Sequence, residues 1–279
     1  MAQPPLSQQI RILEKSLGLE LFARTTRSVA LTSAGEALRP GAQRLVAAAD
    51  SLSLRMEELR TGTRGSLRLG FVDSASYQIM PTVLNALRQM WPDGEFELRT
   101  LSSDEQHRAL VTGDIDLGIG RVHGPDDDVD AVSLLDEPIV VAVHVDHELA
   151  HRESLVLEDL AGETLVGFDR RVSPSLHAEM FRLFSAHGVG YDPVIEATEY
   201  TSILGLVASG QGLAVVPGGV QTFRPPSLRY VRLENVDATS SMMLMSRAGE
   251  SSPFLAAASQ IIVSVLDDHV PLARMKEMS

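Results

Sequence analysis

A strand–helix alternation that occurs twice constrains the fold of this chain more than any other feature of its sequence. The first series reads as strand 67–72, helix 75–90, strand 95–101, helix 104–112 and strand 115–120. The second reads as strand 164–168, helix 174–187, strand 193–199, helix 201–209 and strand 212–216. Because strands that alternate with helices form right-handed βαβ units, the pattern predicts two α/β lobes with mostly parallel sheets.

Two further segments connect these predicted lobes. The apolar run PIVVAVHV (138–145) is typical of a buried strand and can cross from one lobe to the other. From Ser240 onward, a strand (SMMLMS) and a helix (LAAASQIIVSVLDD) have no sheet of their own, so we expect them to return to the first lobe. The first lobe is then discontinuous, comprising 65–137 and 239–279, and the second lobe spans 138–238.

The chain begins with a predicted amphipathic helix. Pro4 and Pro5 suit a first helical turn, where the missing N–H of proline is no loss. An apolar stripe at spacings of four, three and four consists of Leu6, Ile10, Leu13 and Leu17. The opposite face is polar and suited to contacts with bases and phosphates; it carries Gln3, Ser7, Gln8 and Arg11.

Residues 18–31 (GLELFARTTRSVAL) are typical of a short hairpin. Gly18 ends the helix, and strand-like residues flank a turn at Thr25–Ser28. Arg24 and Arg27 lie on this hairpin without an acidic neighbour, which suits phosphate contact.

A second helix is predicted from Ser33, which has capping-box spacing to Glu36. Apolar residues then repeat as a heptad seam: Leu38, Ala42, Leu45, Ala49, Leu52, Met56 and Leu59. Such a seam favours a partner helix and hence a dimer, although a helix packed on its own domain remains an alternative. Pro40–Gly41 predict a kink or a later helix start, and the linker helix of 36–64 ends in the joint TGTRG (61–65).

Charge and composition narrow the class of protein. The net charge is −13, yet residues 1–64 hold nine Lys/Arg against six Asp/Glu, whereas the remainder holds 15 against 31. A basic N-terminal segment on an otherwise acidic chain is expected when that segment binds a polyanion. A chance surplus of three positive charges explains the asymmetry equally well. Because the sequence has no cysteine, no membrane-spanning apolar run and no signal peptide, we expect a cytoplasmic protein without membrane contact.

Three serine-rich points follow predicted strands or open helices, where open α/β sheets bind ligands. They are Asp73–Ser74, Ser102–Ser103 and Ser173–Pro174–Ser175, the last preceded by Arg170 and Arg171. Each offers a hydroxyl and backbone N–H groups at the positive end of a helix. Every one of these serines could instead be a plain N-cap. For the set, a cleft between two lobes predicts a small ligand that carries a carboxylate.

Patterns for catalysis and metal binding are weak. Gly118, Gly120 and Gly124 lack the spacing of a dinucleotide fingerprint. His144, His147 and His151 leave a strand into a loop and share no helix face, so a solvated loop is favoured over a metal site. The sequence also has no G-x-S-x-G elbow and no phosphate loop. We therefore expect no enzyme, no cofactor and no metal.

The segment QPPLSQQIRILEKSLGLELFARTTRSVALTSAGEAL strongly resembles the recognition helix and wing of LysR-type transcriptional regulators. The resemblance extends over essentially the whole chain. It includes the linker helix and the stretches ALVTGDIDLGIGR, VVAVHVDHELA, LEDLAGETLV and LGLVASGQGLAVVP. The second half looks most like the branch that senses benzoate- or muconate-type compounds.

This resemblance implies an α/β protein with three parts. They are a partial winged helix-turn-helix over 1–35, the long linker helix, and a two-lobed effector domain similar in fold to periplasmic solute-binding proteins. It implies a homotetrameric activator or repressor, with RNA polymerase as a further partner. It places Pro4, Ser7, Gln8 and Arg11 toward DNA, Arg24 and Arg27 on the wing, and Ser74, Ser103 and the Ser173–Ser175 turn around the effector.

Family members have two helices before this recognition helix, and such helices aim it into the major groove. We therefore expect either that the natural chain begins upstream or that this form dimerises without binding DNA, and we expect weak specific DNA binding. A stand-alone solute-binding protein, which shares the bilobal fold, is the alternative function. The missing signal peptide, the heptad seam and the basic wing argue against it.

Overall fold

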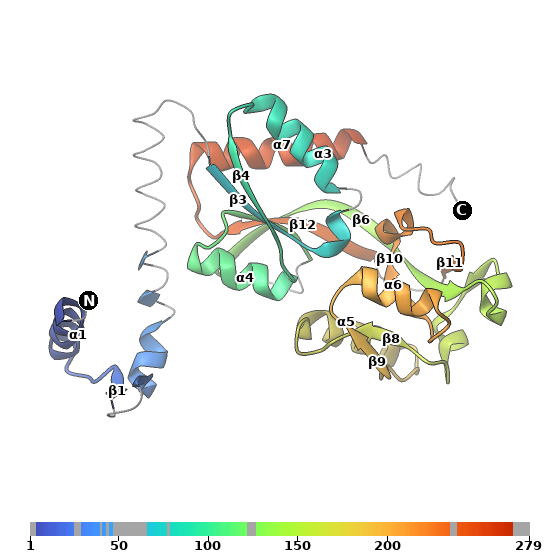
Figure 1. Cartoon of the computed structure of the whole chain (residues 1–279), viewed down its shortest axis with the longest axis horizontal. Helices are drawn as coiled ribbons and strands as arrows, with labels where there is room; N and C mark the ends of the chain where they lie inside the picture. The colour runs from blue at the N-terminus through green and yellow to red at the C-terminus, as the bar shows by residue number, and fades with distance from the viewer. Residues whose placement is uncertain are drawn as a thin grey trace. The chain divides into compact units, whose positions relative to one another are not determined.

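The structure, a computed structural model, describes residues 4–24, 29–39, 41–42, 45–46, 66–76, 79–121, 127–234 and 239–269 (Figure 1). The chain divides between residues 54 and 55 into two compact units, which are described separately. Most of the predicted linker helix over 36–64, including Pro40 and the seam beyond Leu45, lies outside the described residues.

In the first unit, helix α1 (Pro4–Leu17) begins at the proline pair and ends before Gly18, whose φ is 68°. The Glu14 carboxylate accepts hydrogen bonds from the backbone N–H groups of Leu21 (2.9 Å) and Phe22 (3.2 Å). These bonds direct the chain into the antiparallel pair of β1 (Phe22–Arg24) and β2 (Val29–Leu31). The predicted hairpin is therefore confirmed.

Residues 33–39 are helical, but the predicted cap at Ser33 is wrong by one residue. The Thr32 hydroxyl accepts from the Gly35 N–H at 3.1 Å, which gives Thr32 the N-cap role. Along α1, the apolar stripe is largely uncovered within this unit, since Leu6, Leu13 and Leu17 are between 44% and 64% exposed.

The second unit contains both lobes. In the first lobe, β3 (Ser66–Phe71) lies between β4 (Glu95–Thr100) and β5 (Leu117–Gly120), and all three strands are parallel. Helices α3 (Ile79–Met90) and α7 (Pro253–His269) cover one face of this sheet, and α4 (Ser103–Thr112) covers the other (Figure 1). A short 3-10 helix, η1 (Asp73–Ser76), follows β3.

Two long strands join the lobes. Strand β6 (Val129–His144) is longer than the predicted 138–145 and pairs first with β12 (Thr239–Arg247), then with β10 (Ala214–Pro217) and β11 (Leu228–Leu233). Because β12 also pairs with β5, the chain after Thr239 completes the first lobe. The predicted parallel pairing is confirmed for β3, β4 and β5. The pairings of β6 and β12 are antiparallel, so the sheet is mixed and not mostly parallel.

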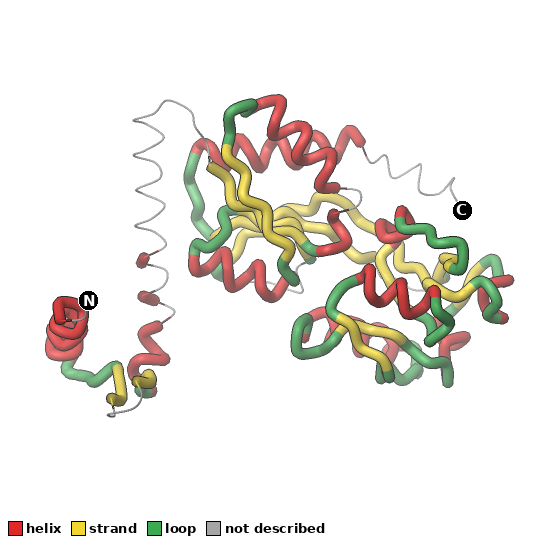
Figure 2. Tube along the Cα trace, viewed as in Figure 1, coloured by secondary structure: helices red, strands yellow, loops and turns green. Residues whose placement is uncertain are grey.

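Helices lie on both sides of the second lobe's strands (Figure 2). Val141 and Val143 of β6 contact the cluster around Phe184 of α5 (Pro174–Ala186), whereas Val140 and Ala142 contact the cluster around Ile203 of α6 (Tyr200–Ala208). This alternation buries both faces of β6 over residues 139–143. The remaining elements are β7 (Ser154–Leu155), β8 (Val166–Phe168), β9 (Ile195–Ala197), η2 (Glu148–His151), η3 (Leu157–Leu160) and η4 (Gly218–Thr222).

A search of the described residues for a helix long and apolar enough to cross a membrane finds none.

Candidate functional site

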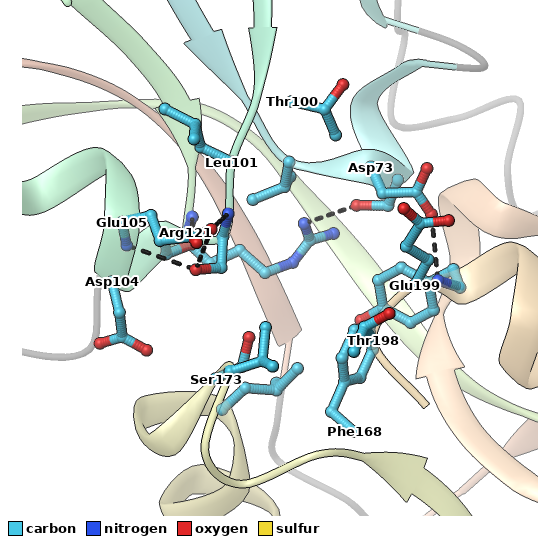
Figure 3. A pocket seen from close by; sticks show the side chains of 17 residues that line it. Asp73, Thr100, Leu101, Asp104, Glu105, Arg121, Phe168, Ser173, Thr198 and Glu199 are labelled. Carbon is cyan, nitrogen blue, oxygen red and sulfur yellow. Dashed lines mark hydrogen bonds between the residues drawn. The ribbon is translucent and has the colours of Figure 1, made fainter. Parts of the chain in front are cut away.

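A cavity of about 200 Å³ lies between the two lobes (Figure 3). Its first-lobe wall is formed by residues 72–74, 100–105 and 121, and its second-lobe wall by residues 168, 172–173, 176 and 198–200. The first-lobe residues follow β3, β4 and β5, so the cavity lies at the carboxyl ends of parallel strands, where this class of sheet binds ligands. The volume suits a small ligand.

Arg121, directly after β5, is the central charged group of this cavity. Its side chain is 7% exposed and forms a buried ion pair with the carboxylate of Glu137 on β6. The guanidinium also donates to the Ser74 hydroxyl at 3.0 Å and to the Ser240 hydroxyl at 2.6 Å. Because Glu137 and Ser240 belong to the two strands that join the lobes, Arg121 is held where the lobes meet.

Burial raises the pKa of Glu137, although Arg121 and the backbone N–H of Gly219 both oppose the shift. An ion pair with so little exposure has a large desolvation cost, which only a nearby countercharge and hydrogen bonds offset. Gly219 lies on η4 in the second lobe, so the carboxylate of Glu137 is bonded from both lobes.

Two predicted serines present hydroxyl groups to the cavity. The Ser103 oxygen accepts from the backbone N–H of Arg121 at 2.9 Å, and the Ser74 oxygen accepts from its guanidinium. A hydroxyl that accepts a bond keeps its own proton to donate. Ser74 and Ser103 can therefore each donate an O–H to an anion in the cavity.

Ser102 also lines the cavity, but its side chain caps the N-terminus of its own helix, α4. Its hydroxyl accepts from the Glu105 N–H at 3.3 Å, and its backbone N–H donates to the Glu105 carboxylate at 2.8 Å, which is a complete capping box. The hydroxyl also donates to that carboxylate at 2.9 Å. The N-cap interpretation of this serine is therefore confirmed.

Of the predicted Ser173–Ser175 turn in the second lobe, only Ser173 lines the cavity. Ser173 is buried, lines the cavity and makes no side-chain cap bond. Ser175 instead donates to Asp104 of the first lobe at 2.5 Å, while Arg170 and Pro174 are exposed and outside the lining. The neighbouring Arg171 lowers the pKa of Asp169 to about 2 through a bidentate ion pair.

Asp73 makes a second contact between the lobes. Its carboxylate accepts from the backbone N–H of Tyr200 at 3.0 Å, at the first turn of α6. Burial raises the pKa of Asp73, the N–H groups of Tyr200 and Thr201 lower it, and the neighbouring carboxylate of Glu199 raises it.

Arg121 and Tyr200 are site residues that were missed in the sequence. Arg121 follows IDLGIG at the carboxyl end of a predicted strand, so the rule that selected Ser74 and Ser103 also selects it. Tyr200 follows no such signal, because its place in the cavity depends on how the two lobes pack.

The predicted DNA-facing residues lie in the first unit. On α1, Gln8 and Arg11 are exposed and Ser7 is partly exposed. Gln3 and Arg27 lie outside the described residues, as do the side chains of Pro4 and Arg24.

Metal-ligating side chains do not gather in the part of the chain that the structure describes: no group of three or more His, Cys, Asp or Glu there could hold an ion. The His147 ring nitrogen Nδ1 accepts from the Leu149 N–H at 3.3 Å, which is a local turn bond.

Two family models match the chain. The model described as "LysR substrate binding domain" matches residues 60–267. The model described as "Bacterial regulatory helix-turn-helix protein, lysR family" matches residues 1–36.

Among individual proteins, the probable cat1 operon transcriptional activator of Acinetobacter lwoffii is 31% identical over 270 residues, covering 96% of this chain and 89% of the relative. The effector-binding domain of BenM, solved with its effector benzoate, has a TM-score of 0.67 at 29% identity and covers 74% of this chain and 94% of that chain. Full-length CbnR, solved with its target DNA, has a TM-score of 0.63 at 25% identity and covers 95% and 91%.

Proposed function

The chain belongs to the LysR family of bacterial transcriptional regulators, and from this premise we propose that a small carboxylate-bearing effector binds between its two lobes and controls its action on DNA. The observation that carries the proposal is the convergence of Ser74, Ser103 and Arg121 on one cavity. Two hydroxyl groups and a guanidinium that line one cavity provide the donors that a carboxylate accepts.

The opposite wall suits the body of such an effector. Phe168, Val172 and Leu176 of the second lobe line the cavity with apolar side chains. BenM, whose effector-binding domain this unit resembles, is solved with benzoate, a carboxylate on an apolar ring. An aromatic-derived acid is therefore a suitable first candidate effector.

We further propose that the exposed polar face of α1, with Gln8 and Arg11, contacts DNA, as the helix-turn-helix match suggests. A homodimer or homotetramer through the linker helix would place two such faces on spaced half-sites. Effector binding would shift the population of lobe arrangements and thereby the spacing of these faces.

RNA polymerase would be the partner of the activated form. The stand-alone solute-binding alternative gains no support, because the matched relatives are named as transcriptional regulators.

Ser103→Ala tests the proposed pocket. Loss of one O–H donor to a charged carboxylate costs about 1.5–3 kcal/mol, so we expect benzoate to bind at least about tenfold more weakly by isothermal titration calorimetry. Ser264→Ala is the matched control, since that serine on α7 is exposed, lies outside the cavity lining and donates to the Ile261 carbonyl of its own helix at 3.1 Å. If Ser103→Ala binds benzoate as tightly as the unmodified chain does, the carboxylate site lies elsewhere.

A further inference from the structure

We propose that the effector carries a single carboxylate, because the second-lobe wall of the cavity rejects a second one. This inference rests on the proposed function, which places a carboxylate against Ser74, Ser103 and Arg121 of the first lobe. A second carboxylate on the same ligand would have to bind to the second lobe. The starts of two helices there, which would attract an anion, are already engaged by carboxylates of the protein itself. The hydroxyls of Ser173 and Thr198 also line that wall, but they carry no charge.

The first of these groups is the start of α6. A helix N-terminus binds anions through its free N–H groups and its dipole. Here the Asp73 carboxylate, which comes from the first lobe, accepts from the Tyr200 N–H at 3.0 Å and also bonds the N–H of Thr201. The anion position at α6 is therefore filled by a side chain of the protein.

The second group is the start of α5. Pro174 occupies its first turn and has no N–H to offer. The next residue, Ser175, donates both its hydroxyl (2.5 Å) and its backbone N–H (3.4 Å) to Asp104 of the first lobe. A ligand carboxylate at this helix would meet the negative charge of Asp104.

Apart from the hydroxyls of Ser173 and Thr198, the rest of the second-lobe wall is unfavourable for an anion. Phe168, Val172 and Leu176 are apolar, and the exposed Glu199 adds a carboxylate beside that of Asp73, as Figure 3 shows. Arg121, the cation among the described residues of this lining, lies on the first-lobe wall, where the first carboxylate would bind. A neutral apolar group fits this wall, whereas a second negative charge would be desolvated next to two like charges.

Matched pairs of acids test the inference on the full chain. Isothermal titration calorimetry would compare benzoate with terephthalate and pentanoate with glutarate, each pair differing by one carboxylate. We expect the monocarboxylate of at least one pair to bind, and its dicarboxylate to bind at least about tenfold more weakly. Equal affinities within a binding pair would overturn the inference and leave the proposed function standing. No binding by any of the four acids would contradict the proposed effector class, and the inference with it.

Glu199→Gln tests the origin of the selectivity. Removing this charge while keeping the side-chain shape is expected to reduce the ratio of monocarboxylate to dicarboxylate affinity at least about threefold. Glu158→Gln, an exposed carboxylate on η3 outside the cavity, is the control and is expected to leave the ratio unchanged. Thermal unfolding of each variant verifies that it is folded. An unchanged ratio in a folded Glu199→Gln chain would overturn the assignment to this wall.

Discussion

Arg121→Met is expected to lower the free energy of unfolding of the effector-binding unit by about 3–5 kcal/mol. The substitution removes the only cation that pairs with Glu137 among the contacts described for that carboxylate, and Glu137 is 4% exposed. A buried charge left without its partner retains its full desolvation cost. Urea denaturation of the two chains at pH 7 measures the difference.

The loss of unfolding free energy in Arg121→Met should become smaller as the pH falls. Burial already raises the pKa of Glu137, and removing Arg121 removes an influence that lowers it. A carboxyl group whose pKa is higher in the folded than in the unfolded state favours folding more as the pH falls. The deficit of Arg121→Met is therefore expected to be smaller at pH 5 than at pH 8. A deficit that is the same at both values would contradict an ionised, unpaired Glu137.

The double variant Arg121→Met/Glu137→Leu separates stability from binding. Replacing both ends of a buried ion pair with apolar side chains is often neutral, so most of the lost stability should return. Benzoate affinity should not return, because the guanidinium is absent. Arg229→Met, on the exposed face of β11, serves as the control and is expected to change stability by less than about 0.5 kcal/mol. If the double variant is no more stable than the single one, the buried pair does not explain the loss.

Phe184→Ala is expected to cost about 3–5 kcal/mol, the second large effect. Phe184 is fully buried on α5, and its ring lies 5.0 Å from that of Tyr191. Truncation leaves a cavity in the apolar cluster that holds α5 against β6. Because α5 also carries Leu176 of the effector cavity, we expect weaker benzoate binding as well as a lower midpoint of thermal unfolding.

Phe181→Ala provides a control on the same helix. Phe181 lies three residues earlier and is 53% exposed, so its removal should change stability by less than about 0.5 kcal/mol. Similar losses in the two variants would contradict core packing as the cause of the effect.

The two-lobed architecture was predictable because it depends on local patterns. Apolar strands such as 67–72 and amphipathic helices such as 201–209 are readable within short windows. The first half of β6 was missed because most of its side chains are exposed or partly exposed, so VDAVSLLD lacks the continuous apolar run seen in 138–145. The antiparallel entry of β12 depends on pairing with residues more than 100 positions away, which no local pattern encodes.

The same distinction applies to the site. Ser74 and Ser103 were predictable because they follow strands of the first sheet. The contacts of Asp73 with Tyr200 and of Asp104 with Ser175 join residues 127 and 71 positions apart, and they exist only because the lobes meet. The expected roles of Arg170 and Pro174 came from their position beside a serine turn, and the fold exposes both side chains outside the cavity lining.

The length of β6 restricts how proteins with this architecture can diverge. One uninterrupted strand pairs with β12 in the first lobe and with β10 and β11 in the second. Since side chains alternate between its faces, inserting or deleting one residue at the crossing would exchange the positions of Val140 and Val141 between two apolar clusters. Insertions and deletions are therefore confined to loops, whereas cavity-lining residues outside the Arg121–Glu137 ion pair can be substituted without shifting the strand. A new effector specificity can thus evolve by point substitution without any change in the length of the crossing strand.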